Sequence, residues 1–128
     1  MFRKVLIANR GEIAIRIART LREMEIRSVG LFTPADRGAP HLFSCDETFE
    51  IDSYLNGSAV LKAARESRSD AIHPGYGFLS QNGDFAEACK GIIFIGPTPE
   101  SMRRMANKHD SRITAEKAGV PVIPGTGA

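Results

Sequence analysis

Short apolar runs that alternate with helical patterns are the feature that most constrains this fold. The apolar runs predict β-strands at residues 4–8, 28–33, 48–51, 71–73, 92–95 and 120–123. Most of them lack the alternation of polar and apolar residues that is typical of a strand with one face in water. We therefore expect an α/β fold: a Rossmann-like open parallel sheet with helices on both faces.

The segments between these runs have the apolar spacing and the terminal residues that are typical of helices. Apolar residues recur at helical spacing from Ile13 to Met24, directly after the first strand. Ser58 follows an Asn-Gly pair and is the expected N-cap of the next helix. Helices are accordingly expected at residues 13–24, 58–67 and 83–90, in a short segment that opens with Pro99, and at 108–117.

The composition is that of one globular domain. Of the 128 residues, 42% are hydrophobic and 25% are charged, which is close to the average for globular proteins. Basic and acidic residues are interspersed and the net charge is only +2, so the sequence lacks the clustered basic residues that are typical of nucleic-acid binders. We find neither an apolar run near the roughly 20 residues of a membrane span nor a signal peptide, and expect a cytoplasmic protein. The two cysteines lack CxxC spacing and histidine neighbours, so no metal site is expected.

Two polar loops should meet at one end of the predicted sheet. Residues 9–11 follow the first strand and residues 73–77 follow the fourth, and these strands are neighbours in the usual doubly wound order. Ligands of such sheets bind where strand ends meet, so the loops should flank one crevice. Tyr76, between two glycines, either packs back onto the body or covers a ligand. Arg10 either binds an anion or, as we favour, braces its loop against a carboxylate.

Other chemistries are disfavoured by the same residues. His73 at a strand end is expected to be structural, with a hydrogen-bonded ring. Glu12 and Glu87 look isolated, on helix surfaces, and no Ser/His/Asp set or metal cluster has a useful spacing. The GxGxxG fingerprint is missing after the first strand, and Thr33 stands where an acidic ribose ligand would be expected, so NAD binding is disfavoured.

Motifs along nearly the whole chain resemble those of biotin carboxylases. They include KVLIANRGEIA at 4–14, ADR at 35–37, SYLN at 53–56, AIHPGYGFLS at 71–80, DFAE at 84–87, FIGP at 94–97 and AGVP at 118–121. The resemblance implies that residues 1–125 form the family's N-terminal domain, which precedes an ATP-grasp fold. It also implies that residues 126–128 begin a linker, with the ATP-grasp and C-terminal domains absent from the 128 residues.

The resemblance also implies roles for particular residues. Lys108 matches a lysine that contacts ATP phosphate, and Tyr76 and Gly77 match the loop beside the biotin ring. Arg19 and Glu23 match residues of the family's homodimer interface. Without the resemblance, Lys108 would be interpreted as an ordinary lysine at a helix start. Arg19 and Glu23 would be interpreted as part of the solvated face of the first helix.

Enzymes of this family convert bicarbonate and MgATP to carboxyphosphate, whose carboxyl group passes to biotin on a carrier protein. The cofactors implied for the intact enzyme are therefore ATP, Mg and biotin, with none bound tightly by this chain alone. The implied partners are a biotin carboxyl carrier protein or domain, a carboxyltransferase and a second copy of the enzyme. The family's catalytic residues lie in later domains, so we expect no carboxylase activity from the isolated chain. Gln81 and Asn107 stand where the family usually has an acid.

Two alternative functions remain open from the sequence. The chain would also fit a non-catalytic dimerisation or interaction module that retains the fold. It would fit a domain of another ATP-grasp ligase, such as carbamoyl-phosphate synthetase, although the unbroken run at 73–80 is closer to biotin carboxylases. Self-association that Arg19→Glu abolishes would favour the first of these alternatives.

Overall fold

A five-stranded parallel sheet forms the centre of the computed structural model, which describes residues 1–124. The strand order is β3-β2-β1-β4-β5, and every neighbouring pair is parallel. The strands are β1 (Lys4–Ile7), β2 (Arg27–Phe32), β3 (Glu47–Glu50), β4 (Ala71–His73) and β5 (Ile93–Phe94). This order confirms the predicted open α/β sheet. Successive strands are added on one side of β1 up to β3 and on its other side from β4 onward, and such sheets bind ligands at this change in strand order.

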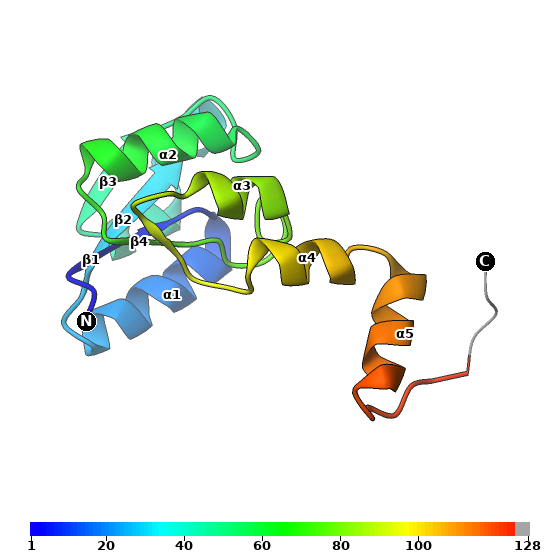
Figure 1. The fold of residues 1–128 in the computed structure, drawn as a ribbon. Coiled ribbons are helices and arrows are strands. Elements are labelled where there is room, and N and C mark those ends of the chain that lie inside the picture. The colour runs from blue at the N-terminus through cyan, green and yellow to red at the C-terminus, as the bar shows by residue number, and fades with distance from the viewer. Residues whose placement is uncertain (125–128) are drawn as a thin grey trace.

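Helices cover both faces of the sheet. Figure 1 shows α2 and α3 on one side and α1 on the other, while α4 leads away from the sheet to α5. The helices are α1 (Gly11–Glu23), α2 (Gly57–Glu66), α3 (Gly83–Ala88), α4 (Pro99–Met105) and α5 (Lys108–Lys117), with 3-10 turns η1 (Pro34–Asp36) and η2 (Pro40–Ser44) between β2 and β3. The expected helices are therefore all present, with ends that differ by a few residues.

Two local predictions were wrong. Residues 120–123 form no strand, because the chain has left the sheet through α4 and α5 and an isolated apolar run finds no strand to pair with. The N-cap of α2 is Asn56, not Ser58: the Asn56 side chain accepts a hydrogen bond of 3.1 Å from the backbone N–H of Ala59. The helix thus begins at Gly57, ahead of the predicted cap.

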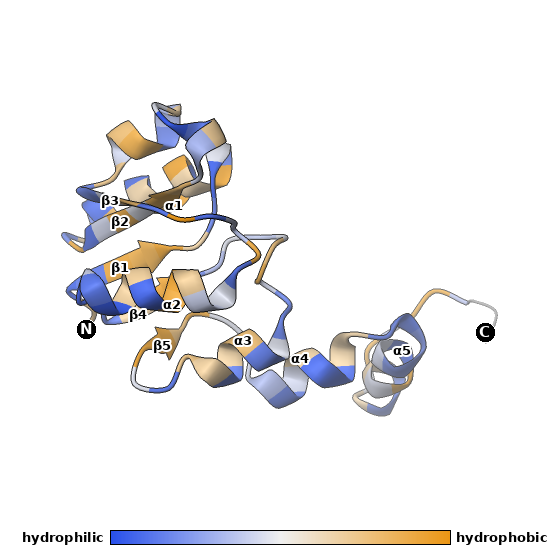
Figure 2. Ribbon diagram, turned by 90° about the horizontal axis from the view of Figure 1, so that it is seen from above, coloured by the Kyte–Doolittle hydropathy of each residue, from blue (hydrophilic) through white to orange (hydrophobic). Residues whose placement is uncertain are grey.

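The core consists of two apolar clusters, one on each face of the sheet. Leu6 points to the α2 and α3 side, while its neighbours Val5 and Ile7 point to the α1 side, and all three are fully buried. Successive residues of a strand face opposite sides of a sheet, so a strand covered on both faces must be apolar throughout. In Figure 2 the hydrophobic colour accordingly follows β1, β4 and β5.

The described part of the chain has no helix with the length and apolarity needed to cross a membrane. The expected linker at residues 126–128 lies outside the described residues, and the domain boundary at 125 stays a prediction.

Candidate functional site

Asn9 joins the loops that follow β1 and β4. Its side chain is 2% exposed, and its Nδ2 donates hydrogen bonds to the carbonyl oxygens of Pro74 (2.8 Å) and Tyr76 (2.7 Å). The same amide accepts a bond from the backbone N–H of Arg10 through Oδ1. Gly75 has φ +66° and lies so close that an added Cβ would be 2.7 Å from Asn9 Nδ2. The two loops that were predicted to flank one crevice are therefore joined by hydrogen bonds. Residues 9–11 and 73–78 together form a connected surface, which we call the wall.

Arg10 braces this wall against Asp36. Its guanidinium donates to both carboxylate oxygens of Asp36, from Nε at 2.6 Å and from Nη2. The Tyr54 hydroxyl donates a further bond of 2.8 Å to the same carboxylate. Hydrogen bonding to Arg10 lowers the pKa of Asp36 to about 2, against the opposing effect of burial. This confirms the interpretation of Arg10 as a bracing residue.

The far end of the β4 loop is tied to the same bracing group. The Phe78 ring packs on the Tyr54 ring with centroids 5.2 Å apart at an angle of 36°. Phe78 also adopts a left-handed backbone conformation (φ 42°), which non-glycine residues seldom adopt. The wall is thus held at both ends, by Asn9 near its start and by Tyr54 near its end.

Tyr76 and Glu12 meet across the two loops. The Tyr76 hydroxyl donates a hydrogen bond to the Glu12 carboxylate, which lies in the first turn of α1. This bond raises the pKa of Tyr76, because the carboxylate holds the phenol proton and opposes a second negative charge. Glu12 is on the surface, as predicted, but it is not isolated, and neither is Glu87, whose carboxylate accepts a 2.5 Å hydrogen bond from Arg103. Glu12 and Tyr76 are 64 positions apart, and only the parallel topology reveals that they are neighbours.

His73 is a structural part of the wall, as expected. Its Nδ1 accepts a 3.0 Å hydrogen bond from the backbone N–H of Gly75, and burial lowers its pKa. A neutral ring with an accepting Nδ1 fits this arrangement.

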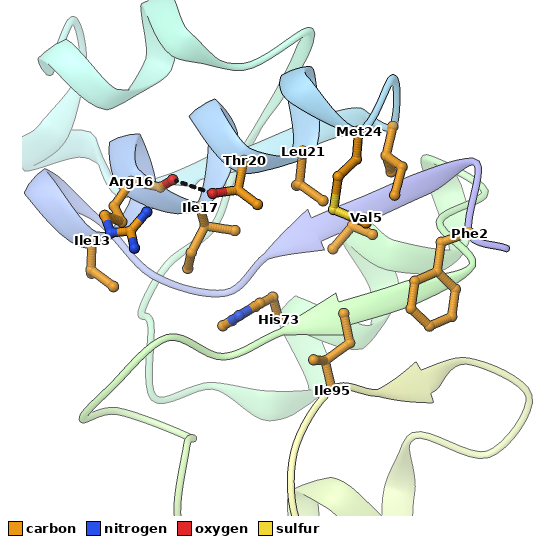
Figure 3. Close-up of a pocket in the computed structure, with 11 residues that line it drawn as sticks. Phe2, Val5, Ile13, Arg16, Ile17, Thr20, Leu21, Met24, His73 and Ile95 are labelled. Carbon is orange, nitrogen blue, oxygen red and sulfur yellow. Dashed lines mark hydrogen bonds between the residues drawn. The ribbon is translucent and has the colours of Figure 1, made fainter.

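An apolar groove of about 390 Å³ lies between α1 and the ends of β4 and β5. Figure 3 shows Ile13, Ile17, Val5 and Ile95 lining it, with Phe2 at one end. His73 and Arg16 are among its few polar neighbours. Phosphate groups need several hydrogen-bond donors or cations when they leave water, and a lining that is apolar apart from Arg16, Thr20 and His73 is a poor match for them. Within residues 1–124, no group of three or more His, Cys, Asp and Glu side chains could hold a metal ion.

The remaining predicted site residues lie away from the two joined loops. Lys108 is exposed at the start of α5, and α4 separates that helix from the sheet in both views (Figures 1 and 2). Asn107 caps α5 by accepting a 2.8 Å bond from the backbone N–H of His109. Arg19 and Glu23 are exposed on α1. The structure thus joins Tyr76 to Glu12 but does not bring Lys108 to them.

Comparison with known proteins gives consistent matches. The sequence model described as "Biotin carboxylase, N-terminal domain" matches residues 1–102. Biotin carboxylase 2 of Bacillus subtilis is 49% identical over 98% of this chain and 30% of its own length. Human mitochondrial pyruvate carboxylase is 46% identical, again over 98% of this chain but only 12% of its own length.

Solved structures agree with the sequence matches. The biotin carboxylase domain of Hydrogenobacter thermophilus 2-oxoglutarate carboxylase, a dimer in complex with MgADP, ADP and bicarbonate, superposes with a TM-score of 0.92 and 43% identity. This match covers 98% of this chain and 29% of that one. Rhizobium etli pyruvate carboxylase gives a TM-score of 0.90 and 41% identity, over 98% of this chain and 14% of that one. The chain thus spans less than a third of these relatives, and it belongs to the family of biotin carboxylase N-terminal domains.

Proposed function

We propose that this chain acts as the N-terminal domain of a working biotin carboxylase, which uses ATP and bicarbonate to carboxylate biotin on a carrier protein. The observation that carries the proposal is the braced wall at the point where the strand order reverses, in a chain whose relatives are biotin carboxylases. A wall held by Asn9, Arg10 and Tyr54 presents a fixed surface to a ligand. Such preorganisation reduces the entropy lost on binding.

Tyr76 and Gly77 are the residues that we place beside biotin. Tyr76 is 60% exposed, and no atom outside residues 76–78 lies within 4 Å of the position that a Cβ on Gly77 would occupy. An exposed aromatic side chain next to open backbone can pack against the bicyclic ring system of biotin, in which a planar, polar ureido ring is fused to an apolar thioether ring. The wall contributes position and shape, and the carboxylation chemistry comes from ATP, Mg and bicarbonate bound by the rest of the enzyme.

Lys108 is proposed to contact an ATP phosphate in the intact enzyme. Its ammonium group is exposed at the start of α5, so it can reach a ligand that other domains hold. A lysine ammonium is a compact charge that commonly binds phosphate. We assign no catalytic residue to residues 1–124.

Arg19 and Glu23 are proposed to pair two copies of the enzyme. They are exposed residues of opposite charge, four positions apart on α1, so they lie on one side of the helix. A two-fold axis beside this row would place Arg19 of each copy opposite Glu23 of the other. Arg19→Glu should therefore weaken the dimer, while Arg19→Glu combined with Glu23→Arg should restore it, as sedimentation would show. The other proposed partners are a biotin carboxyl carrier protein or domain and a carboxyltransferase, in the cytoplasm.

A domain exchange tests the proposed function. Residues 1–124 would replace the matching segment of biotin carboxylase 2 of Bacillus subtilis, which is 49% identical. We expect the chimera to cleave ATP in a manner that depends on bicarbonate and free biotin, and the 128-residue chain alone to be inactive. A chimera that folds and dimerises but lacks this dependence would contradict the proposal and favour an interaction module without chemistry.

A further inference from the structure

The backbone of Tyr76 is fixed, but packing does not fix its ring. Asn9 holds the Tyr76 carbonyl at 2.7 Å, and the flanking Gly75 and Gly77 have φ of +66° and +65°. The residue as a whole is nevertheless 60% exposed. An exposed aromatic side chain ordinarily changes rotamer on the picosecond to nanosecond timescale. The orientation of this ring therefore depends on what its hydroxyl binds.

Glu12 supplies that binding partner from a rigid element. It belongs to the first turn of α1, which Ala14, Ile17 and Leu21 anchor in the core. A carboxylate is also favoured at this end of a helix, where free N–H groups carry partial positive charge. The acceptor for the Tyr76 hydroxyl is thus held in place independently of the β4 loop.

We propose that Glu12 is a positioning residue for biotin, which holds the Tyr76 ring beside the two joined loops in the orientation that the biotin ring meets. The inference rests on the proposed place of Tyr76 beside biotin. Without Glu12 the ring has to be immobilised when biotin binds. The cost of immobilising one side chain corresponds to about a three- to ten-fold loss of affinity.

The contact itself can be tested in the 128-residue chain. The chain has two tyrosines and no tryptophan, so phenolate absorbance reports on Tyr76 and Tyr54 alone. Burial and the Asp36 carboxylate raise the pKa of Tyr54, and it ionises at higher pH than an exposed tyrosine. We expect Glu12→Ala to lower the pKa of Tyr76, since the carboxylate that opposes phenolate formation is gone. Glu25→Gln, which neutralises an exposed carboxylate just beyond α1, should leave the titration unchanged.

The positioning role can be tested in the chimera through the KM for free biotin. Glu12→Ala should raise this KM about three- to ten-fold and leave the KM for ATP unchanged. Glu12→Gln keeps an oxygen that can accept the phenol proton and should restore most of the affinity. Tyr76→Phe removes the donor and should raise the biotin KM by a similar factor. Adding Glu12→Ala to Tyr76→Phe should cause no further loss, because both changes break the same bond.

Each outcome separates this inference from the function on which it rests. If the chimera with unmutated residues 1–124 shows no biotin-dependent ATP cleavage, both the proposed function and the positioning role of Glu12 are overturned. An active chimera in which Glu12→Ala leaves the biotin KM unchanged, or adds its full effect to that of Tyr76→Phe, would overturn the positioning role alone. An unchanged Tyr76 titration in Glu12→Ala would overturn the contact.

Discussion

Replacing the Asp36 carboxylate by an amide should destabilise the domain and do so in a pH-dependent way. Asp36 is 7% exposed and accepts hydrogen bonds from both Arg10 and Tyr54. Asp36→Asn keeps the size of the side chain but removes the charge that pairs with Arg10. The guanidinium of Arg10 is half exposed, so water can solvate it in the variant and limit the loss.

The expected loss in the free energy of unfolding can be worked out in two ways, which agree. A hydrogen bond to a charged group contributes about 1.5–3 kcal/mol. The pKa of Asp36 falls from its ordinary value of 3.8 to about 2, which corresponds to about 2 kcal/mol of stability at neutral pH. Because the folded-state pKa is the lower one, this stability is present above about pH 4 and disappears as the pH falls through about 2. We expect a loss of about 2 kcal/mol at pH 7, or a fall in Tm of roughly 5–10 °C.

Urea unfolding followed by circular dichroism measures this difference at pH 7 and again near pH 2. Glu50→Gln is the matched control, because Glu50 also binds an arginine, Arg37 at 2.7 Å, but at the surface. That variant should lose at most about 0.5 kcal/mol. The reasoning is refuted if Asp36→Asn is no more destabilising than the control at pH 7, or if its deficit persists unchanged at pH 2.

Three further predictions concern stability and reactivity. Asn56→Ala should cost about 1 kcal/mol in urea unfolding because it removes the cap of α2, and Ser58→Ala should be nearly neutral; the reverse order would contradict the assigned cap. Gly75→Ala should cost about 1–3 kcal/mol, since φ is +66° and the new methyl group meets Asn9, and a neutral result would refute the close approach. Burial raises the pKa of both cysteine thiols to about 11, so the native chain should react slowly with a disulfide reagent at pH 8 and quickly in urea. Equal rates would contradict the burial of Cys89 and the partial burial of Cys45.

The sheet and the meeting of the two loops were predictable because they follow from local pattern and general topology. Strands buried on both faces must be apolar throughout, and β1 and β4 are neighbours in the usual doubly wound order. The bracing role of Arg10 could likewise be favoured from the sequence, because arginines that pair with carboxylates are frequent in folded proteins.

The predictions that were wrong concern features that depend on three-dimensional geometry, which no local sequence pattern contains. The contact of Glu12 with Tyr76 needs both loops in place before the side chains can reach each other. The apolar run at 120–123 resembles a strand, but strand formation requires a neighbour, and α4 carries the chain away from β5. The cap of α2 depends on where the backbone first turns helical, and that point lies at Gly57.

The most direct test of the proposed function is photo-crosslinking of biotin to the two joined loops. A photoreactive benzoylphenylalanine would replace Tyr76 in the chimera, and Phe43, an exposed aromatic residue of η2 outside both loops, in a control. After illumination with free biotin, MgATP and bicarbonate, we predict biotin on the protein labelled at position 76 and none at position 43. Equal labelling at the two positions, or none at position 76 in a chimera that retains its binding of biotin, would contradict the proposal that this domain forms a wall of the biotin site.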